Sequence, residues 1–239
     1  MGELPPDRGP AGGRYVVAVD QRLPEPTPAQ LRLGEPDRVK AFSDGVFAIV
    51  ITILVLEIGV PTNLSEASLR ESLEETGPEL LAWVISFMIT GMYWVSHRDL
   101  FNQIRRVTRD VVWLNLLLLL PVCLIPFAAS ILGGYHDDPI ALRTYGSVLI
   151  AASLMRWVLW AYVARRPSLL HEPFDAHSRR IHGLLTLAPI AAYVLAMALA
   201  GIAPLGSLVL YLVIPGLYFI LVTVMRQHPE TADVVDDLS

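Results

Sequence analysis

The chain has 239 residues, of which 54% are hydrophobic and 17% are charged, with a formal net charge of −5 and a mean hydropathy of +0.50. This composition is too apolar for an ordinary water-soluble domain and is typical of membrane proteins with several spans. Nucleic acid is not an expected partner, because the basic residues are sorted among loops and do not form one patch. The single cysteine, Cys123, lies in an apolar run, so an internal disulfide is excluded.

The N-terminal segment, residues 1–36, contains seven prolines among glycines and charged residues. This composition predicts a disordered tail, and the segment lacks the apolar stretch of a cleaved signal peptide. We therefore expect membrane insertion to begin with the first helix of a transmembrane domain, residues 37–228. A short acidic tail, residues 229–239, follows that domain.

Six apolar segments are long enough to cross a bilayer. In lipid each of them can satisfy its backbone groups only as a helix. The sequence therefore predicts an all-α integral membrane protein with six transmembrane helices and short loops, at about residues 41–60, 78–97, 110–132, 142–163, 183–202 and 206–225.

Loop charges alternate along the chain. The loops on the predicted acidic side contain mainly carboxylates, whereas the other side contains Arg32, Arg38, Lys40, Arg98, Arg105, Arg106, Arg109, Arg165, Arg166, Arg179 and Arg180. Because positive loops stay in the cytoplasm, this pattern predicts a multi-pass protein of the cell membrane with both termini cytoplasmic.

The first span carries charged and polar residues directly before its apolar run. Arg38, Phe42, Ser43 and Asp44 form an RxxxFSD pattern, and the sequence GVFAIVITILVLEI follows. A charge at the centre of a membrane helix costs about 2.5 to 3.5 kcal/mol on insertion scales, so such residues persist where partners or water satisfy them. The cluster is therefore either a structural lock between helices or the rim of a polar pathway.

One face of the first span is almost entirely aliphatic. At 100° per residue, Ile49, Thr52, Ile53 and Leu56 share this face. Most apolar stripes of this kind simply pack inside a bundle. If several copies converge on a shared axis, Ile49 and Leu56 would instead form rings that gate by dewetting, and Thr52 would offer oxygen ligands to a cation.

The first span resembles the signature of the transmembrane protein 175 family of endolysosomal potassium channels and their prokaryotic homologues. The segment YWVSHRDLF from Tyr93 to Phe101, then Asn115 and the LLPVCLIPF run, is similar to the second and third helices of the prokaryotic branch. The resemblance implies a homotetramer in a lipid bilayer whose four first helices line a pore for passive, potassium-selective conduction. It also implies that the chain needs no cofactor.

The family pattern further implies roles for individual residues. Aliphatic constrictions would fall at Ile49 and Leu56, with Ile49 favoured over Ile53, and the Thr52 layer would contact K⁺ transiently. In that family the FSD residues are structural, so Arg38, Phe42, Ser43 and Asp44 would tie the first helix to neighbouring helices. The expected partners of this motif are Trp94, His97 and Asn115.

Two other classes of function stay open on the sequence alone. A secondary transporter of a small cation or solute would normally show internal repeats and broken helices, and prolines within the spans (Pro121, Pro126, Pro189 and Pro215) allow the latter. A membrane enzyme built on His97, Asp99 and Asp44 is disfavoured, because no nucleophile or oxyanion partner stands in motif spacing. The histidines and carboxylates near residues 171–182 fit no standard metal site.

Overall fold

The computed structural model describes residues 36–59, 73, 76–172 and 174–227, and within these ranges the fold is all-helical. The predicted tails, 1–36 and 229–239, lie outside the described residues except for Pro36. The helices are α2 (Pro36–Leu56), α4 (Gly77–Gln103), α5 (Arg109–Cys123), α6 (Ile125–Gly134), α7 (Pro139–Ala164), α8 (Ala176–Leu199) and α9 (Pro204–Gln227). A single 3₁₀ turn, Pro167–Leu169, follows α7 in this part of the chain.

Counted with α5 and α6 as one bent span, the described helices follow the six predicted spans in number and order. In the described part of the chain, five helical segments are long and apolar enough to cross a membrane, with α5 and α6 counted as one segment. The start of α9, Pro204–Pro215, is a shorter apolar helix. The predicted all-α membrane fold is therefore confirmed.

The first span is shifted relative to the prediction, because α2 begins at Pro36 and ends at Leu56 where the sequence predicted about 41–60. Proline is favoured in the first helical turn, where its missing N–H has no intrahelical partner, and Asp37 there complements the helix dipole. The RxxxFSD residues therefore lie within the helix. At the other end the helix stops at Leu56, and Gly59, three residues later, disfavours helix because glycine loses more backbone freedom on ordering than other residues.

The third span is broken, whereas the sequence predicted one continuous helix over 110–132. The break falls at Leu124, where the N–H bonds to the Pro121 carbonyl three residues earlier. Pro126 has no N–H to offer the carbonyl four residues before it, and its ring crowds that carbonyl. The segment therefore bends between α5 and α6 instead of running straight.

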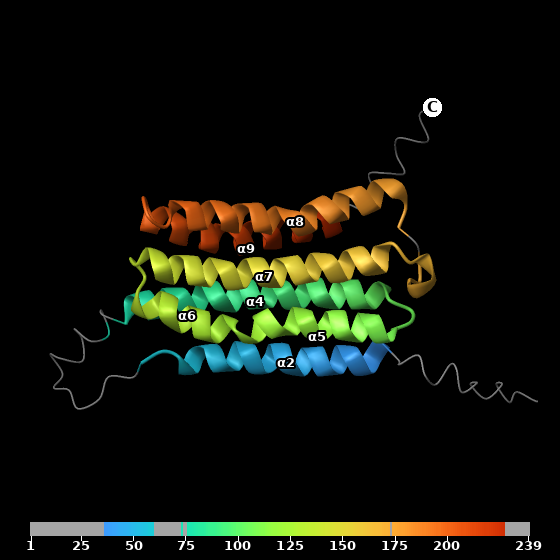
Figure 1. Cartoon of the computed structure of the whole chain (residues 1–239), viewed down its shortest axis with the longest axis horizontal. Helices are drawn as coiled ribbons and strands as arrows, with labels where there is room; N and C mark the ends of the chain where they lie inside the picture. The colour runs from blue at the N-terminus through green and yellow to red at the C-terminus, as the bar shows by residue number, and fades with distance from the viewer. Residues whose placement is uncertain (1–35, 60–72, 74–75, 173, 228–239) are drawn as a thin grey trace, which may run out of the picture. The chain divides into compact units, whose positions relative to one another are not determined.

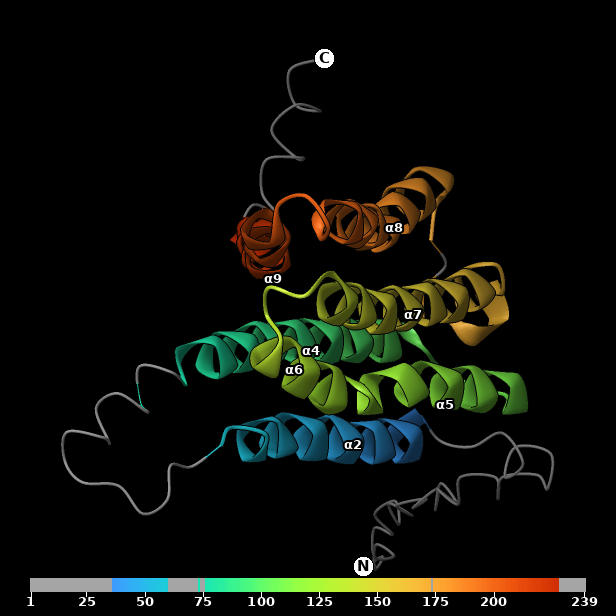
Figure 2. The same cartoon turned by 60° about the vertical axis from the view of Figure 1, so that its left-hand side comes forward.

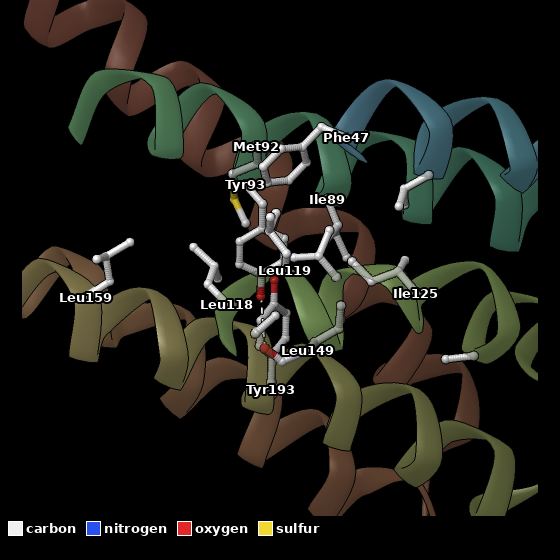
Figure 3. Packing of buried hydrophobic residues seen from close by; sticks show 14 of the residues in the cluster. Phe47, Ile89, Met92, Tyr93, Leu118, Leu119, Ile125, Leu149, Leu159 and Tyr193 are labelled. Carbon is white, nitrogen blue, oxygen red and sulfur yellow. Dashed lines mark hydrogen bonds between the residues drawn. The ribbon is translucent and has the colours of Figure 1, made fainter. Parts of the chain in front are cut away.

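The helices pack in layers, with α2 on one side and α8 and α9 on the opposite side (Figure 1 and Figure 2). Between them lie α4, α5, α6 and α7, and α2 packs against α4, α5 and α6. One continuous core of buried side chains links the layers, from Phe47 in α2 through Tyr93 and Leu118 to Tyr193 in α8 (Figure 3). This order leaves one long face of α2 uncovered.

Buried hydroxyl groups join the middle helices. The Tyr93 hydroxyl donates to the Leu149 carbonyl at 2.9 Å and lies 2.7 Å from the Ser153 hydroxyl, which links α4 to α7. Tyr145 of α7 lies 2.9 Å from the Ser86 hydroxyl of α4. Tyr145 belongs to a Thr-Tyr-Gly sequence that resembles part of a potassium filter, but its buried side chain has this interhelical packing role.

The two ends of the bundle differ in their balance of charges. The start of α2, the end of α4 and the start of α5 lie at one end, together with the end of α7 and the start of α8 (Figure 1). This end holds the arginine-rich loops, whereas Glu79, Asp137 and Asp138 lie at the opposite end. The structure thus groups the loops as the alternating charges predicted. The cytoplasmic assignment of the basic end stays a prediction.

Candidate pore-lining helix and its interhelical contacts

Helix α2 has two distinct faces. Ser43, Phe47, Val50 and Leu54 follow a three-and-four residue spacing and are buried against the neighbouring helices. Leu54 and Phe47 are each 1% exposed, so this face is a complete packing surface. The opposite face must therefore meet something other than its own subunit.

The opposite face holds the side chains that the sequence predicted for a pore. Ile49 is 59% exposed and Leu56 is 78% exposed, while Ile53, at 38%, turns further towards its own subunit. Thr52 is also exposed. The four residues form a continuous aliphatic stripe with a hydroxyl group in its middle, on the face of α2 opposite its buried residues.

Phe42 lies on this stripe as well, since it precedes Ile49 by seven residues and Leu56 by fourteen, which is close to whole helical turns. Its side chain is 55% exposed. The sequence interpretation placed Phe42 with the structural motif, but within one subunit it extends the exposed stripe towards the basic end. The spacing of seven residues could have indicated this placement.

The Thr52 hydroxyl is oriented by its own helix. Its Oγ1 lies 3.0 Å from the Ala48 carbonyl oxygen and 2.9 Å from the Ile49 carbonyl oxygen, and it donates to them. The hydroxyl hydrogen is thus directed towards the backbone, which leaves oxygen lone pairs to accept from, or coordinate, a group outside the subunit. An oxygen ligand of this kind suits a hard monovalent cation.

A buried polar chain fastens α2 to α4 and α5. His97 Nε2 donates to Asn115 Oδ1 at 2.8 Å, and Asn115 Nδ2 donates to Ser43 Oγ at 2.9 Å. Ser43 in turn donates to the Val39 carbonyl at 2.9 Å. All three side chains are at most 1% exposed. Because a buried polar group left without a partner costs about 1–3 kcal/mol, this chain fixes both the position and the rotation of α2.

Aromatic rings enclose the histidine of this chain. The His97 ring stacks on Phe101 with centroids 4.4 Å apart and lies 5.6 Å from the Phe47 ring of α2. These contacts leave the His97 imidazole buried within the helix packing. Its surroundings are those of an interhelical contact.

Asp44 makes a separate contact with α4. The Trp94 indole Nε1–H donates to Asp44 Oδ1 at 2.8 Å, and the Arg98 guanidinium lies 5.2 Å from the Trp94 ring centroid. Asp44 is exposed within the single subunit. The structure thus brings Ser43 and Asp44 to Trp94, His97 and Asn115. The side chains of Arg38 and Phe42 are exposed in the described part of the chain.

Two further contacts, one in the first turns of α2 and one just after its end, were not predicted from the sequence. Lys40 Nζ donates to Asn102 Oδ1 at 2.7 Å near the basic end, and the Gly59 N–H donates to Glu79 Oε2 at 2.9 Å at the other end. Both pairs are far apart in sequence, so no local spacing could have indicated them. They attach both ends of α2 to α4.

Comparisons with known proteins give consistent results. The family model described as endosomal/lysosomal potassium channel TMEM175 matches residues 38–126. A potassium channel of Streptomyces collinus is 35% identical over 189 residues, covering 75% of this chain and 92% of the relative. A potassium channel of a Chryseobacterium species is 40% identical over 128 residues, covering 54% of this chain and 65% of the relative.

A solved structure is similar over most of its length. It is the crystal structure of a lysosomal potassium-selective channel TMEM175 homolog from Chamaesiphon minutus. Its TM-score is 0.70 at 29% sequence identity, and the match covers 77% of this chain and 96% of the other.

Proposed function

This chain belongs to the TMEM175 family, as its first helix predicted, and from that premise we propose that it forms a passive, potassium-selective ion channel. The family is one of ion channels, which are not a class of enzymes. The relatives named above support potassium as the permeant ion. We expect no cofactor, because conduction involves no covalent step.

The pore is formed by four copies of α2 around a shared axis in a homotetramer. The observation that carries this proposal is the exposed stripe of Ile49, Thr52 and Leu56 on a helix whose opposite face is fully packed. If this stripe faced lipid, the Thr52 hydroxyl group would have no role there, because aliphatic side chains alone suit a lipid-facing surface. Facing three identical copies, the stripe would make two aliphatic rings with a ring of four hydroxyl groups between them.

Ion passage follows from the chemistry of these rings. A neck lined by Ile49 and Leu56 expels water when narrow, and a dry neck blocks ions without a charged plug. K⁺ loses part of its hydration there, and the Thr52 oxygens replace some of the lost ligands. Opening therefore requires the rings to widen through tilt or rotation of α2. Of the two neighbouring isoleucines, Ile49 and not Ile53 forms this constriction, because the Ile53 side chain is turned further into its own subunit.

The Ser43 and Asp44 contacts act as a structural lock in this proposal. They hold α2 at a defined rotation against α4 and α5, and this rotation decides which aliphatic side chains face the axis. The protein resides in the cell membrane with both termini and the basic end in the cytoplasm. That orientation follows from the positive-inside rule.

Reconstituted flux tests the proposal. Purified protein in liposomes should carry K⁺ down its gradient without a second solute, show unitary currents in planar bilayers and elute as a tetramer. A secondary transporter would instead couple its flux to a second gradient or saturate without unitary currents. Flux that requires a second ion would contradict the channel proposal, and a monomeric active species would contradict the shared pore.

A further inference from the structure

A groove of about 400 Å³ lies between α7 and α8 at the basic end of the bundle. Three exposed arginines line it: Arg165 directly after α7, and Arg179 and Arg180 in the first turns of α8. Within the described residues that line the groove there is no carboxylate, and Asp175, although close in sequence to Arg179, is not part of the lining. The opening of the groove is therefore strongly positive.

The deeper part of the groove is apolar. Trp157 and Trp160 of α7 face Gly183 and Leu187 of α8 across it. A Cβ atom at Gly183 would lie 3.1 Å from the Trp160 ring, so the glycine lets this ring lie close to α8. From Ala164 to Trp157 the helix rises by ~10 Å, which is about the depth of a phospholipid headgroup and the first part of its acyl chains.

The position of the groove in the bundle indicates what covers it. Helix α8 lies in the outer layer away from α2, and the groove opens between α8 and the neighbouring α7 (Figure 2). If α2 lines a central pore, this side faces the bilayer. The arginines then stand at headgroup level in the leaflet on the basic side, and tryptophan is favoured at that same interface.

We propose that this groove binds the headgroup phosphate of an anionic glycerophospholipid from the cytoplasmic leaflet, with its first acyl carbons against Trp157 and Trp160. Guanidinium groups recognise phosphate through paired, charge-assisted hydrogen bonds, and basic pockets between membrane helices are suited to anionic lipids. Zwitterionic lipids carry a compensating cation next to the phosphate, so they should bind more weakly.

Lipid titration of the full-length, detergent-solubilised protein by native mass spectrometry tests the proposal. The probes are phosphatidylglycerol and phosphatidylcholine with the same acyl chains, with inorganic phosphate as a competitor. The wild type should prefer phosphatidylglycerol. The variant Arg165→Gln/Arg179→Gln/Arg180→Gln should lose about fivefold in affinity per arginine, or roughly a hundredfold in all, and bind the two lipids alike.

A matched variant controls for net charge. Arg105→Gln/Arg106→Gln/Arg109→Gln removes three exposed arginines from the same end of the bundle, outside the groove. It should lose less than about fivefold in affinity, because it changes only the general surface potential. If the groove triple variant fails to elute as folded protein, the single variants Arg165→Gln and Arg180→Gln replace it, each with an expected loss of about fivefold.

Three results would overturn the proposal: equal binding of the two lipids by the wild type, equal losses in the groove and control variants, or displacement of phosphatidylglycerol by equimolar inorganic phosphate. The last result would mean that the arginines bind a free anion and that the apolar part of the groove contributes nothing. Because the measurement reports binding and not conductance, its failure would leave the channel proposal untouched.

Discussion

Replacing Asn115 by Leu should break the polar chain between α2, α4 and α5. Asn115 makes two buried hydrogen bonds, to Ser43 at 2.9 Å and from His97 at 2.8 Å, and Leu of similar size can replace neither. Orphaned buried groups cost about 1–3 kcal/mol each, whereas hydrogen bonds between membrane helices average nearer 0.6 kcal/mol. We therefore expect a loss of about 2–4 kcal/mol for the two bonds together.

The measurement is the melting temperature of the assembled protein in detergent. Size-exclusion chromatography with fluorescence detection reports how much assembled protein remains after heating. A loss of this size should lower the melting temperature by about 5–10 °C, by the scaling of domains of this length. The matched control is Asn102→Leu, which removes the exposed hydrogen bond to Lys40 and should change the melting temperature by less than about 2 °C.

A double-mutant cycle of Asn115→Leu with Ser43→Ala separates the shared bond from general damage. The coupling should be about 1–2 kcal/mol, because each single variant already breaks the same contact. Equal melting temperatures for Asn115→Leu and Asn102→Leu would refute the reasoning. So would an Asn115→Leu channel that keeps full stability and differs only in conductance, since the chain would then belong to the ion path.

Other expected outcomes concern the faces and ends of α2. Thr52→Val should lower the K⁺/Na⁺ permeability ratio by about fivefold, or ~1 kcal/mol, without changing assembly; an unchanged reversal potential in mixed ions would remove Thr52 from the ion path. Ile49→Ala and Leu56→Ala should each raise the basal current, because a ring of smaller side chains admits water more easily. An unchanged basal current in both variants would place the constriction elsewhere. Glu79→Ala leaves the Gly59 N–H without its acceptor, so it should increase amide hydrogen exchange at the end of α2. Exchange equal to that of the wild type would show that this contact does not restrain the helix end.

The number of spans, the all-helical fold and the grouping of basic loops could be predicted because they depend on local properties of the chain. Apolar segments near 20 residues must be helices in lipid, and loop charge follows the same alternation as the spans. The stripe of Ile49, Thr52 and Leu56 was also predictable, since helical spacing alone puts these residues on one face. The structure adds that this face is left uncovered by the subunit.

The candidate site was predictable only in part. The family resemblance named Trp94, His97 and Asn115 as partners of the motif, and the structure places them beside Ser43 and Asp44. It did not indicate that Arg38 stays exposed or that Phe42 extends the stripe. Helical spacing gives the direction of each side chain around α2, but it does not say which directions other helices cover.

What the sequence determined by itself is therefore the set of helical spans and the aliphatic face of the first one, because both follow from hydropathy and a repeat of 3.6 residues. The tertiary structure decided which faces meet. Ser43 and Asn115 are 72 residues apart, and Gly59 and Glu79 are 20 apart, so their contacts depend on how whole helices pack. The bend at Leu124 is set locally, because Pro126 has no N–H to continue the helix. The tertiary structure decides what the two halves contact: α5 packs on α7, and α6 packs on α4 and α7.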